Sequence, residues 1–292
     1  MPTHFRTCNL CEAMCGIAIE HDDGRILSIK GDPQDPLSRG HICPKAVALQ
    51  DIHNDPNRLR TPLRRTPSGW EPLEWDEAFD EVATRLKAIR KAGGQNAVAV
   101  YQGNPTVHNM GSMTYGQWFI KSLHTRSRFS ATSVDQLPRM LSSLLLFGHQ
   151  LLMPVPDLDR TDFLLILGAN PLVSNGSIMT APDIGKRLKA IQARGGTLVV
   201  VDPRRTETAQ AADRHLFIRP GTDAFLLLSL LHTLFQEKRV NPGHLKGFID
   251  ELERVQRAVE GFSPERVAPL IGIDAGAIRT LARDFSAAPR AV

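Results

Sequence analysis

The stretch CNLCEAMCG at residues 8–16, joined later by HICPK at residues 41–45, decides how this chain is interpreted. It holds all four cysteines of the 292 residues, and their spacing is C-x2-C-x3-C-x27-C. Four thiolates form a cage of soft sulfur ligands, which is the ligand set of a [4Fe–4S] cluster. The spacing therefore predicts a cluster bound by Cys8, Cys11, Cys15 and Cys43.

Two other uses of the cysteines stay open from the residues alone. Structural zinc also takes four cysteines, although such sites usually combine two C-x2–4-C pairs, and here the second pair is missing. Disulfides are the third interpretation, but a chain of this size does not need them and no secretory signal supports them. An iron and sulfide assay that found zinc instead would overturn the prediction of a cluster.

Composition limits the classes of partner. The chain carries 35 Lys and Arg against 31 Asp and Glu, and it has no long basic tract, so binding of nucleic acid is weakly supported. An anionic, phosphate-bearing ligand fits this charge better. No run approaches the roughly 20 apolar residues that a membrane span needs, and the N-terminus resembles no signal peptide. We therefore expect no membrane span and a cytoplasmic location.

The hydrophobic pattern predicts three parts. Residues 16–20 and 25–30 predict a hairpin around the turn DDG at 22–24, which brings Cys43 back to the other cysteines within a cluster domain at 1–55. Residues 56–150 predict a helix capped by Asp76 that runs to residue 91, a strand at 97–101, a loop at 102–105 and helices at 111–123 and up to 147.

Residues 151–292 predict a parallel sheet with a row of polar loops. Strands at 163–167, 197–201 and 215–218 are followed by GANP, DPRRT and RPGTD, and helices are expected at 181–194, 223–236, 264–271 and 275–287. Because the carboxyl ends of parallel strands share one edge of a sheet, these loops predict a dinucleotide site. Taken singly, Gly168 and Gly221 are equally read as turn glycines and Asp202 as a helix cap. The absence of G-x-G-x-x-G makes an ordinary NAD site weak.

The order of these motifs resembles the molybdopterin oxidoreductases of the dimethyl sulfoxide reductase class, which include formate dehydrogenases and nitrate reductases. The first cysteine stretch and the VDPRRTETA stretch at 201–209 are the most specific parts of the resemblance, and CPK at 43–45, LGANP at 167–171 and PGTD at 220–223 complete it. Together these motifs span nearly the whole chain.

The resemblance implies a [4Fe–4S] cluster next to a molybdenum (or tungsten) bis-molybdopterin guanine dinucleotide. By this likeness Lys45 bridges cluster and pterin and takes part in catalysis, and Gln102 contacts the pterin; from the residues alone, Lys45 could equally be a solvated lysine. The residues implied to bind the nucleotide ends are Gly168, Asn170, Asp202, Arg204, Arg205, Thr206, Gly221 and Asp223.

The resemblance also implies a protein ligand for the molybdenum, usually at the head of a helix and three residues before a proline. In this chain that position is Asp135, within DQLP at 135–138, and Ser133 is the second choice. From the residues alone, Asp135 could instead only cap the helix.

Length is the departure from the class, whose members usually run well past twice these 292 residues. We therefore expect an α/β chain with a small β-rich cluster domain at 1–55, the first part of a middle α/β domain at 56–150 and a doubly wound dinucleotide-binding domain at 151–292, with the C-terminal part of the family fold absent. The expected role is to pass electrons between a molybdopterin centre, which acts on a small molecule, and an external redox carrier. A non-catalytic iron–sulfur electron-transfer module, a zinc-stabilised nucleotide-binding protein and an inactive fragment that exposes apolar surface are the alternatives.

Overall fold

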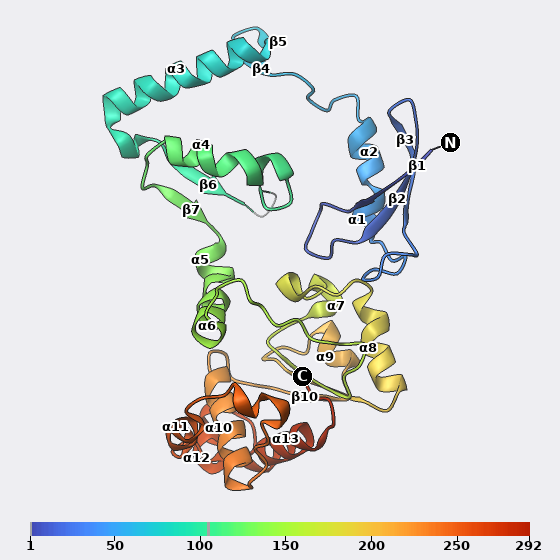
Figure 1. Ribbon diagram of the computed structural model, residues 1–292, viewed down its shortest axis with the longest axis vertical. Helices are drawn as coiled ribbons and strands as arrows, with labels where there is room; N and C mark the ends of the chain where they lie inside the picture. Colours follow the sequence, from blue (N-terminus) through green and yellow to red (C-terminus); the bar gives the residue numbers. More distant parts are fainter. Residues whose placement is uncertain (1, 104–105) are drawn as a thin grey trace. The chain divides into compact units, whose positions relative to one another are not determined.

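The structure is a computed structural model that describes residues 2–103 and 106–292. The chain divides into two compact units, Met1–Pro154 and Val155–Val292, and each is treated by itself. The predicted α/β class with a β-rich N-terminal region is confirmed (Figure 1). The predicted boundaries at 55 and 150 stay predictions.

The N-terminal part of the first unit is a small antiparallel sheet in the order β1-β2-β3. Its strands are β1 (Thr3–Thr7), β2 (Gly16–Asp22) and β3 (Arg25–Gly31). The predicted hairpin is confirmed, and both residues of its turn, Asp23 and Gly24, have positive φ, as a type I′ turn requires. Strand β1 was not predicted, because all five of its side chains are exposed and give no alternating pattern.

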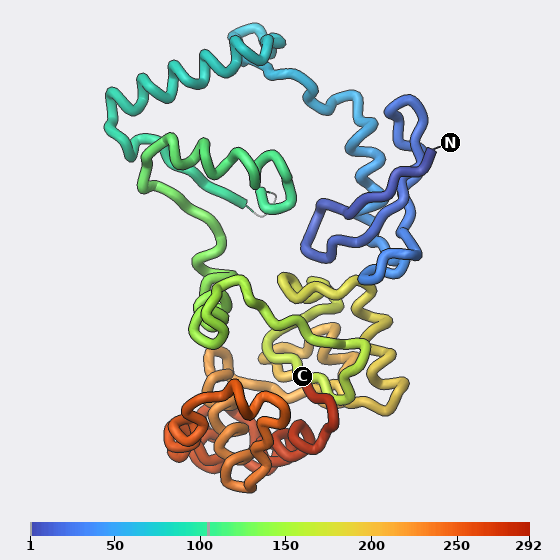
Figure 2. The backbone as a smooth tube through the Cα atoms, in the orientation of Figure 1, coloured from blue at the N-terminus to red at the C-terminus, as the bar shows by residue number. Residues whose placement is uncertain are grey.

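Two short helices follow this sheet and complete the path between the cysteines. Helices α1 (Pro44–Val47) and α2 (Leu49–Asn54) both contact β3. In Figure 2 the blue backbone can be traced from β3 through the connecting loop into these helices. The buried core of this part includes Ile17, Ile29 and Ala46 together with Cys8 and Cys15. Packing of the sheet against α1 therefore fixes the place where the cysteines collect.

The rest of the first unit is built from one long helix and a narrow sheet. A hairpin of β4 (Leu63–Thr66) and β5 (Gly69–Pro72) precedes α3 (Trp75–Gly93), which begins after Glu74, so the prediction that Asp76 caps this helix is wrong. Strand β6 (Val100–Gln102) starts later than predicted because residues Gln95–Ala97 form a 3₁₀ turn. It pairs in parallel with β7 (Arg128–Ser130), which had no counterpart among the predicted elements.

The remaining helices of this unit are short, and Asp135 lies at the end of one of them. The predicted helix at 111–123 is a π-helical turn (Ser112–Gly116) that continues as α4 (Gln117–Ser122). Helices α5 (Thr132–Asp135) and α6 (Leu137–Phe147) follow β7.

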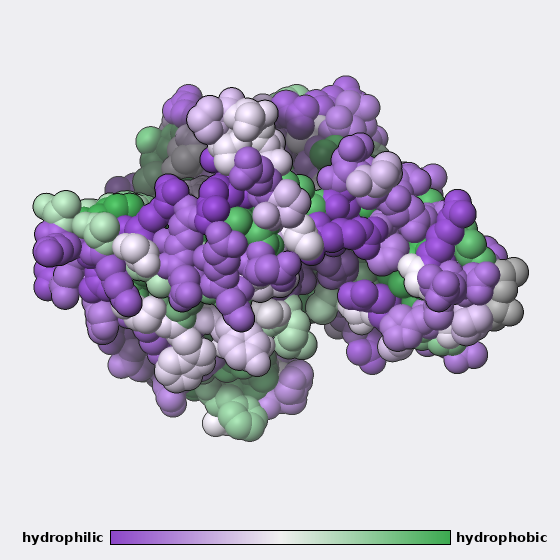
Figure 3. All heavy atoms as spheres, turned by 90° about the horizontal axis from the view of Figure 1, so that it is seen from above, coloured by the Kyte–Doolittle hydropathy of each residue, from purple (hydrophilic) through white to green (hydrophobic). Residues whose placement is uncertain are grey.

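The first unit exposes apolar side chains on its narrow sheet and on the helices that follow the two strands. Parallel sheets are normally covered on both faces, and here that cover is incomplete. Tyr101, Trp118, Phe129, Leu145 and Leu146 are each more than half exposed. Figure 3 shows apolar side chains at the surface among hydrophilic ones.

The second unit contains the predicted parallel sheet, in the order β10-β9-β8. Strands β8 (Phe163–Leu167) and β9 (Thr197–Val201) have the predicted bounds. Strand β10 (Arg214–Leu216) begins one residue earlier and ends two residues earlier than predicted. The connections are α7 (Pro171–Ser174) and α8 (Ile184–Ala193) after β8, and α9 (Glu207–Ala211) after β9. Backbone bonds from Asp162 and Leu165 to Arg290 and Val292, both 2.8 Å, continue the ladder beyond β8.

Side chains that alternate along the strands make two separate cores. Leu198 and Val200 of β9 pack with α8 and α9 on one face of the sheet. Val199 and Val201 pack on the other face with α10 (Asp223–Gln236), α12 (Pro264–Ile271) and α13 (Ala275–Ala287). Because both faces are covered, β9 is completely buried apart from Thr197, as expected for a central strand of a doubly wound sheet.

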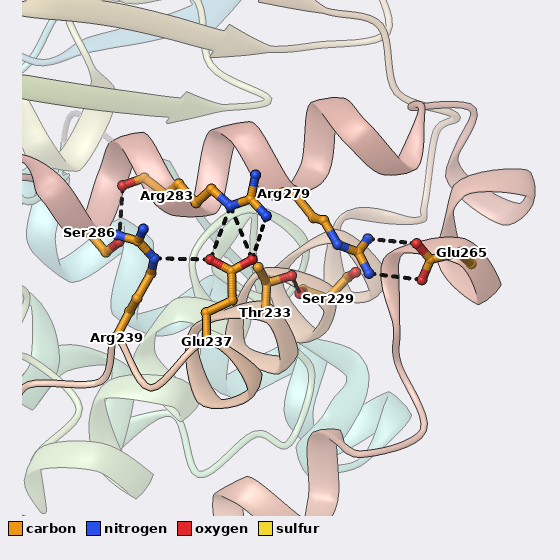
Figure 4. Close-up of polar contacts among 8 residues, drawn as sticks. All are labelled: Ser229, Thr233, Glu237, Arg239, Glu265, Arg279, Arg283 and Ser286. Carbon is orange, nitrogen blue, oxygen red and sulfur yellow. Dashed lines mark hydrogen bonds and ion pairs between the residues drawn. The ribbon is translucent and has the colours of Figure 1, made fainter.

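Ion pairs tie the helices of the second core together at their polar faces (Figure 4). Glu237 accepts hydrogen bonds from Arg283 at 2.8 and 3.0 Å and from Arg239 at 3.0 Å, and Arg279 pairs with Glu265 at 2.8 Å. The Arg283 guanidinium, aided by Arg239, lowers the pKa of Glu237. Exposed pairs of this kind contribute little to stability, so they align helices that the apolar core holds. In the described part of the chain, no helix has both the length and the hydrophobicity to cross a membrane.

Replacing Leu226 by Ala is expected to destabilise the second unit by about 2–5 kcal/mol, because a fully buried Leu leaves a cavity in the core. Leu227→Ala is the matched control, because Leu227, the next residue on α10, is 43% exposed. Urea unfolding followed by circular dichroism measures both. Equal midpoints for the two variants would contradict the assignment of this core.

Candidate cofactor site

The first three cysteines lie on a loop that closes on itself between β1 and β2. The amide of Cys8 donates to the carbonyl of Cys15 at 2.8 Å, and the amide of Met14 donates to the carbonyl of Cys11 at 3.2 Å. Cys8 and Cys15 are buried, and Cys11 and Cys43 are half-buried. All four thiols are free, and all four belong to one hydrophobic cluster of the first unit. The fold therefore brings the four predicted ligands together.

The thiols also lie close enough to influence each other electrostatically. Burial, followed by the neighbouring charges of Cys8, Cys11 and Cys43, raises the pKa of Cys15 to about 11. Burial also raises the pKa of Cys8, with Cys11 and Cys43 adding to the shift. Crowded thiolates repel each other, and bound iron would offset that repulsion. The set of donors thus fits an iron–sulfur cluster.

Within residues 2–103 and 106–292, no three His, Cys, Asp or Glu side chains are placed to hold a single metal ion. In a cluster each cysteine binds a different iron atom, so its sulfurs need not converge on one centre as they do around zinc.

The fourth predicted ligand, Cys43, follows a loop that hydrogen bonds hold against the residue after Cys15. Asp35 accepts hydrogen bonds from the amide of Ser38 at 2.6 Å and from its hydroxyl at 2.7 Å, and the Ser38 hydroxyl accepts from the amide of Gly16 at 3.1 Å. These bonds lower the pKa of Asp35. A Cβ on Gly16 would lie 2.4 Å from the Cβ of Asp35, so only glycine fits directly after Cys15. Ser38 and Asp35, which the sequence did not single out, therefore fix the approach of Cys43.

The raised pKa of Cys15 predicts a pH dependence for the metal-free chain. In the unfolded chain this thiol titrates near 9.0 and in the folded chain near 11. Between these values the unfolded chain has lost a proton that the folded chain keeps, so the free energy of unfolding falls as pH rises. Urea unfolding at several pH values between 8 and 11 should show a shallower fall for Cys15→Ser than for the wild type. Parallel curves would contradict this prediction.

The other residues predicted in the first unit lie in different local settings. Lys45 is exposed on the first turn of α1, two residues after Cys43, and Gln102 is half-buried at the end of β6. The predicted loop after β6 includes Asn104 and Pro105, which lie outside the described residues. Asp135 is exposed at the end of α5, and Gln136 holds the N-cap position of α6. The alternative that Asp135 only caps the following helix is therefore wrong. Ser133 is exposed on the same short helix.

In the second unit, the loops after β8 and β9 are joined at one edge of the sheet. The Asn170 carboxamide oxygen accepts from the hydroxyl of Thr208 at 2.7 Å and from its amide at 3.2 Å, while its nitrogen donates to Glu207 at 2.8 Å. Thr208 in turn accepts from the amide of Leu172 at 3.1 Å. The side chain of Asn170 thus links two loops, although it was predicted to line the nucleotide.

Two more predicted residues also use their side chains to shape a loop. Asp202 is 8% exposed and accepts from the amide of Arg204 at 2.7 Å. Thr206, not Asp202, caps α9 by accepting from the amide of Ala209 at 3.1 Å. The alternative in which Asp202 is a helix cap is therefore wrong, because Asp202 shapes the turn before the helix.

The groups that remain available for a ligand lie at the tips of these loops. Arg204 and Arg205 are exposed. Gly168 and Gly221 have φ of +58° and +78°, and apart from their chain neighbours no described atom lies within 4 Å of the place where a Cβ would stand on either glycine. Asp223 is the first residue of α10 and is half-buried. Two arginines beside side-chain-free backbone amides suit a diphosphate.

Sequence reasoning missed Glu207 and Thr208, which hold the first two loops together. Glu207 accepts hydrogen bonds from its own backbone amide and from Asn170, and these bonds lower the pKa of its carboxylate. The guanidinium of Arg204 lies 3.9 Å from the same carboxylate. Thr206 is a favoured N-cap residue and Glu207 is an acidic residue of the first helical turn, so this pair is a helix-start signal that could have located them.

Comparison with known proteins gives two family matches that together cover most of the chain. Residues 5–55 match the molybdopterin oxidoreductase Fe4S4 domain, and residues 58–280 match molybdopterin oxidoreductase. These domains carry a [4Fe–4S] cluster and a molybdopterin cofactor, in agreement with the predicted cofactors.

Relatives match nearly the whole chain but continue well beyond the match. Formate dehydrogenase H of Escherichia coli is 28% identical over 97% of this chain and 40% of its own length. Periplasmic nitrate reductase of Desulfovibrio desulfuricans is 27% identical over 96% of this chain and 38% of its own length. In structure, the acetylene hydratase of Pelobacter acetylenicus matches 96% of this chain and 38% of its own, with a TM-score of 0.73 and 28% identity.

The chain therefore spans about two fifths of the length of these relatives. The matches agree with the arrangement of cysteines and strand-end loops described above. The chain belongs to the molybdopterin oxidoreductase family.

Proposed function

We propose that this chain is the cluster- and cofactor-binding portion of a molybdenum-dependent oxidoreductase. It passes electrons between a molybdopterin centre and an external carrier through the [4Fe–4S] cluster. The observation that carries the proposal is the gathering of four free thiols from two separate loops into one partly buried group. The substrate is a small molecule, and the carrier is a redox protein or subunit. A cytoplasmic location stays a prediction.

The strand-end loops of the second unit bind the guanine dinucleotide part of the cofactor. Arg204 and Arg205 pair with the phosphates, and the open backbone at Gly168 and Gly221 lets a phosphate approach the amides. The Asn170–Thr208 link holds the first two loops in register, so that both contribute to one ligand. The proposed cofactor is the bis-guanine dinucleotide form.

In the first unit, protein groups orient and tune the cofactors. Lys45 places an ammonium two residues from a cluster ligand, where it donates a hydrogen bond to the pterin and offsets the negative charge of the thiolates. Gln102 offers an amide from the end of β6. When bound, molybdopterin supplies a metal that exchanges an oxo group or a hydride with the substrate.

Asp135 is proposed as the protein ligand of molybdenum, because it offers an exposed carboxylate that no helix cap uses. Asp135→Ala is expected to lower the molybdenum that the chain retains while leaving its iron unchanged. Ser133→Ala is the matched control on the same helix and also tests the second choice of ligand. Metal analysis of both variants decides: unchanged molybdenum in Asp135→Ala would remove Asp135 from the site.

We further propose that these 292 residues alone bind the cluster and only part of the bis-dinucleotide, and so do not turn over. The exposed aromatic and leucine side chains of β6, β7, α4 and α6 support this proposal. In that case the isolated chain acts as a non-catalytic iron–sulfur module. A purified chain with full molybdenum occupancy and turnover would contradict it.

A further inference from the structure

A histidine far along the sequence faces the loop that supplies three cluster ligands. His108 follows β6, and its Nε2 lies 3.6 Å from the Oε1 of Glu12, which stands between Cys11 and Cys15. The two residues are separated by 96 positions but belong to the same compact unit. The contact therefore connects the cysteine loop to the position of His108.

Both side chains of this contact are partly or largely buried. The side chain of His108 is only 14% exposed and that of Glu12 is 33% exposed. Nε2 of His108 is buried and has no hydrogen-bond partner among the residues that the structure describes. A buried ring nitrogen without a partner is costly, so the nearby carboxylate is its natural counterpart once the two move slightly closer.

Both ends of the contact are held by their own backbone. The carboxamide oxygen of Asn109 accepts from the amide of Ser112 at 2.8 Å, which fixes the turn that directly follows His108. On the other side, the bond from the Met14 amide to the Cys11 carbonyl fixes the turn that carries Glu12. Because neither turn depends on the contact for its shape, the contact sets the position of one turn against the other.

We propose that His108 is a positioning residue for the iron–sulfur cluster and acts through Glu12 on the Cys11–Cys15 loop. It holds the ligand loop against the turn at 108–112, so that the ligand sulfurs keep their places when iron binds. This inference rests on the proposed function, because it assumes that the cysteines bind a cluster.

A double-variant cycle on the full 292-residue chain tests the contact. Chain reconstituted with iron and sulfide under nitrogen is exposed to EDTA, and the loss of visible absorbance gives the rate of cluster loss. We expect His108→Leu and Glu12→Ala, which remove the donor and the acceptor respectively, each to lose the cluster roughly three- to tenfold faster than the wild type. The double variant should be no faster than the faster single variant, because both changes remove one contact.

Two variants show whether the effect belongs to this contact. His108→Gln keeps an N–H donor and should stay within about twofold of the wild-type rate. His4→Leu, an exposed histidine of β1 four residues before Cys8, should leave the rate unchanged. The two contact-breaking variants, His108→Leu and Glu12→Ala, should also shift the electron paramagnetic resonance of the reduced cluster in the same way, which a general loss of stability would not do.

The proposal is overturned by a wild-type rate in His108→Leu or by rates that multiply in the double variant. If His108→Leu does not fold, Glu12→Ala decides alone, and a wild-type rate in that variant overturns the proposal. A wild-type chain that holds no cluster would overturn the proposed function as well, whereas a stable cluster without coupling would overturn only the role of His108.

Discussion

Replacing Cys43 by Ser is expected to abolish the [4Fe–4S] cluster. Cys43 is the one proposed ligand from outside the first loop, and the Asp35–Ser38 bonds hold its loop against Gly16. Without it, three thiols remain for four irons, and a serine hydroxyl is a poor substitute for a soft thiolate. Iron and acid-labile sulfide per chain, measured after anaerobic reconstitution, should fall from about four each to near zero.

Asn9→Ser is the matched control for this variant. Asn9 is exposed between Cys8 and Cys11, so its replacement changes the same short loop without removing a thiol. Iron and sulfide should stay at the wild-type level. A Cys43→Ser chain that keeps a full cluster would mean that another group is the fourth ligand.

The second large effect is expected at the loop after β9. Replacing both Arg204 and Arg205 by Gln should weaken binding of GDP, which represents the nucleotide end of the cofactor, by about ten- to hundredfold. Each guanidinium offers a planar pair of N–H donors to phosphate, and both side chains are exposed at the tip of the loop. Isothermal titration calorimetry measures the affinity.

Arg257→Gln controls for the general effect of charge. Arg257 is exposed on α11 (Leu252–Val259), in the same unit, and its loss lowers the positive charge without touching a strand-end loop. Its affinity for GDP should match that of the wild type. An unchanged affinity in the double variant would show that these arginines do not bind the phosphates.

The elements predicted well from the sequence are those whose pattern reflects burial. Strands β8 and β9 have the predicted bounds because their side chains alternate between two apolar cores. Strand β1 was missed because its five exposed side chains show no alternation, and its strand character comes only from pairing with β2. The turn of β2 and β3 was predicted because Asp-Gly favours the positive φ that both turn residues adopt.

The residues of the candidate site could be predicted from the sequence. Which of them shape the loops and which remain free to bind a ligand could not. The motifs located Asn170, Asp202 and Thr206, yet the structure uses these side chains to build the loops. A short polar side chain next to a strand end can serve either purpose, and only three-dimensional contacts decide between them. Glu207 was missed because its partner Asn170 lies 37 residues away in sequence.

The measurement that tests the account most directly is the metal and nucleotide content of one anaerobic preparation of the 292-residue chain. Elemental analysis, sulfide assay and GMP release by acid hydrolysis are done on the same sample. The account predicts a brown protein with about four iron and four sulfide per chain, together with molybdenum and GMP in less than full amounts. A colourless protein that contains zinc and releases no GMP would contradict it.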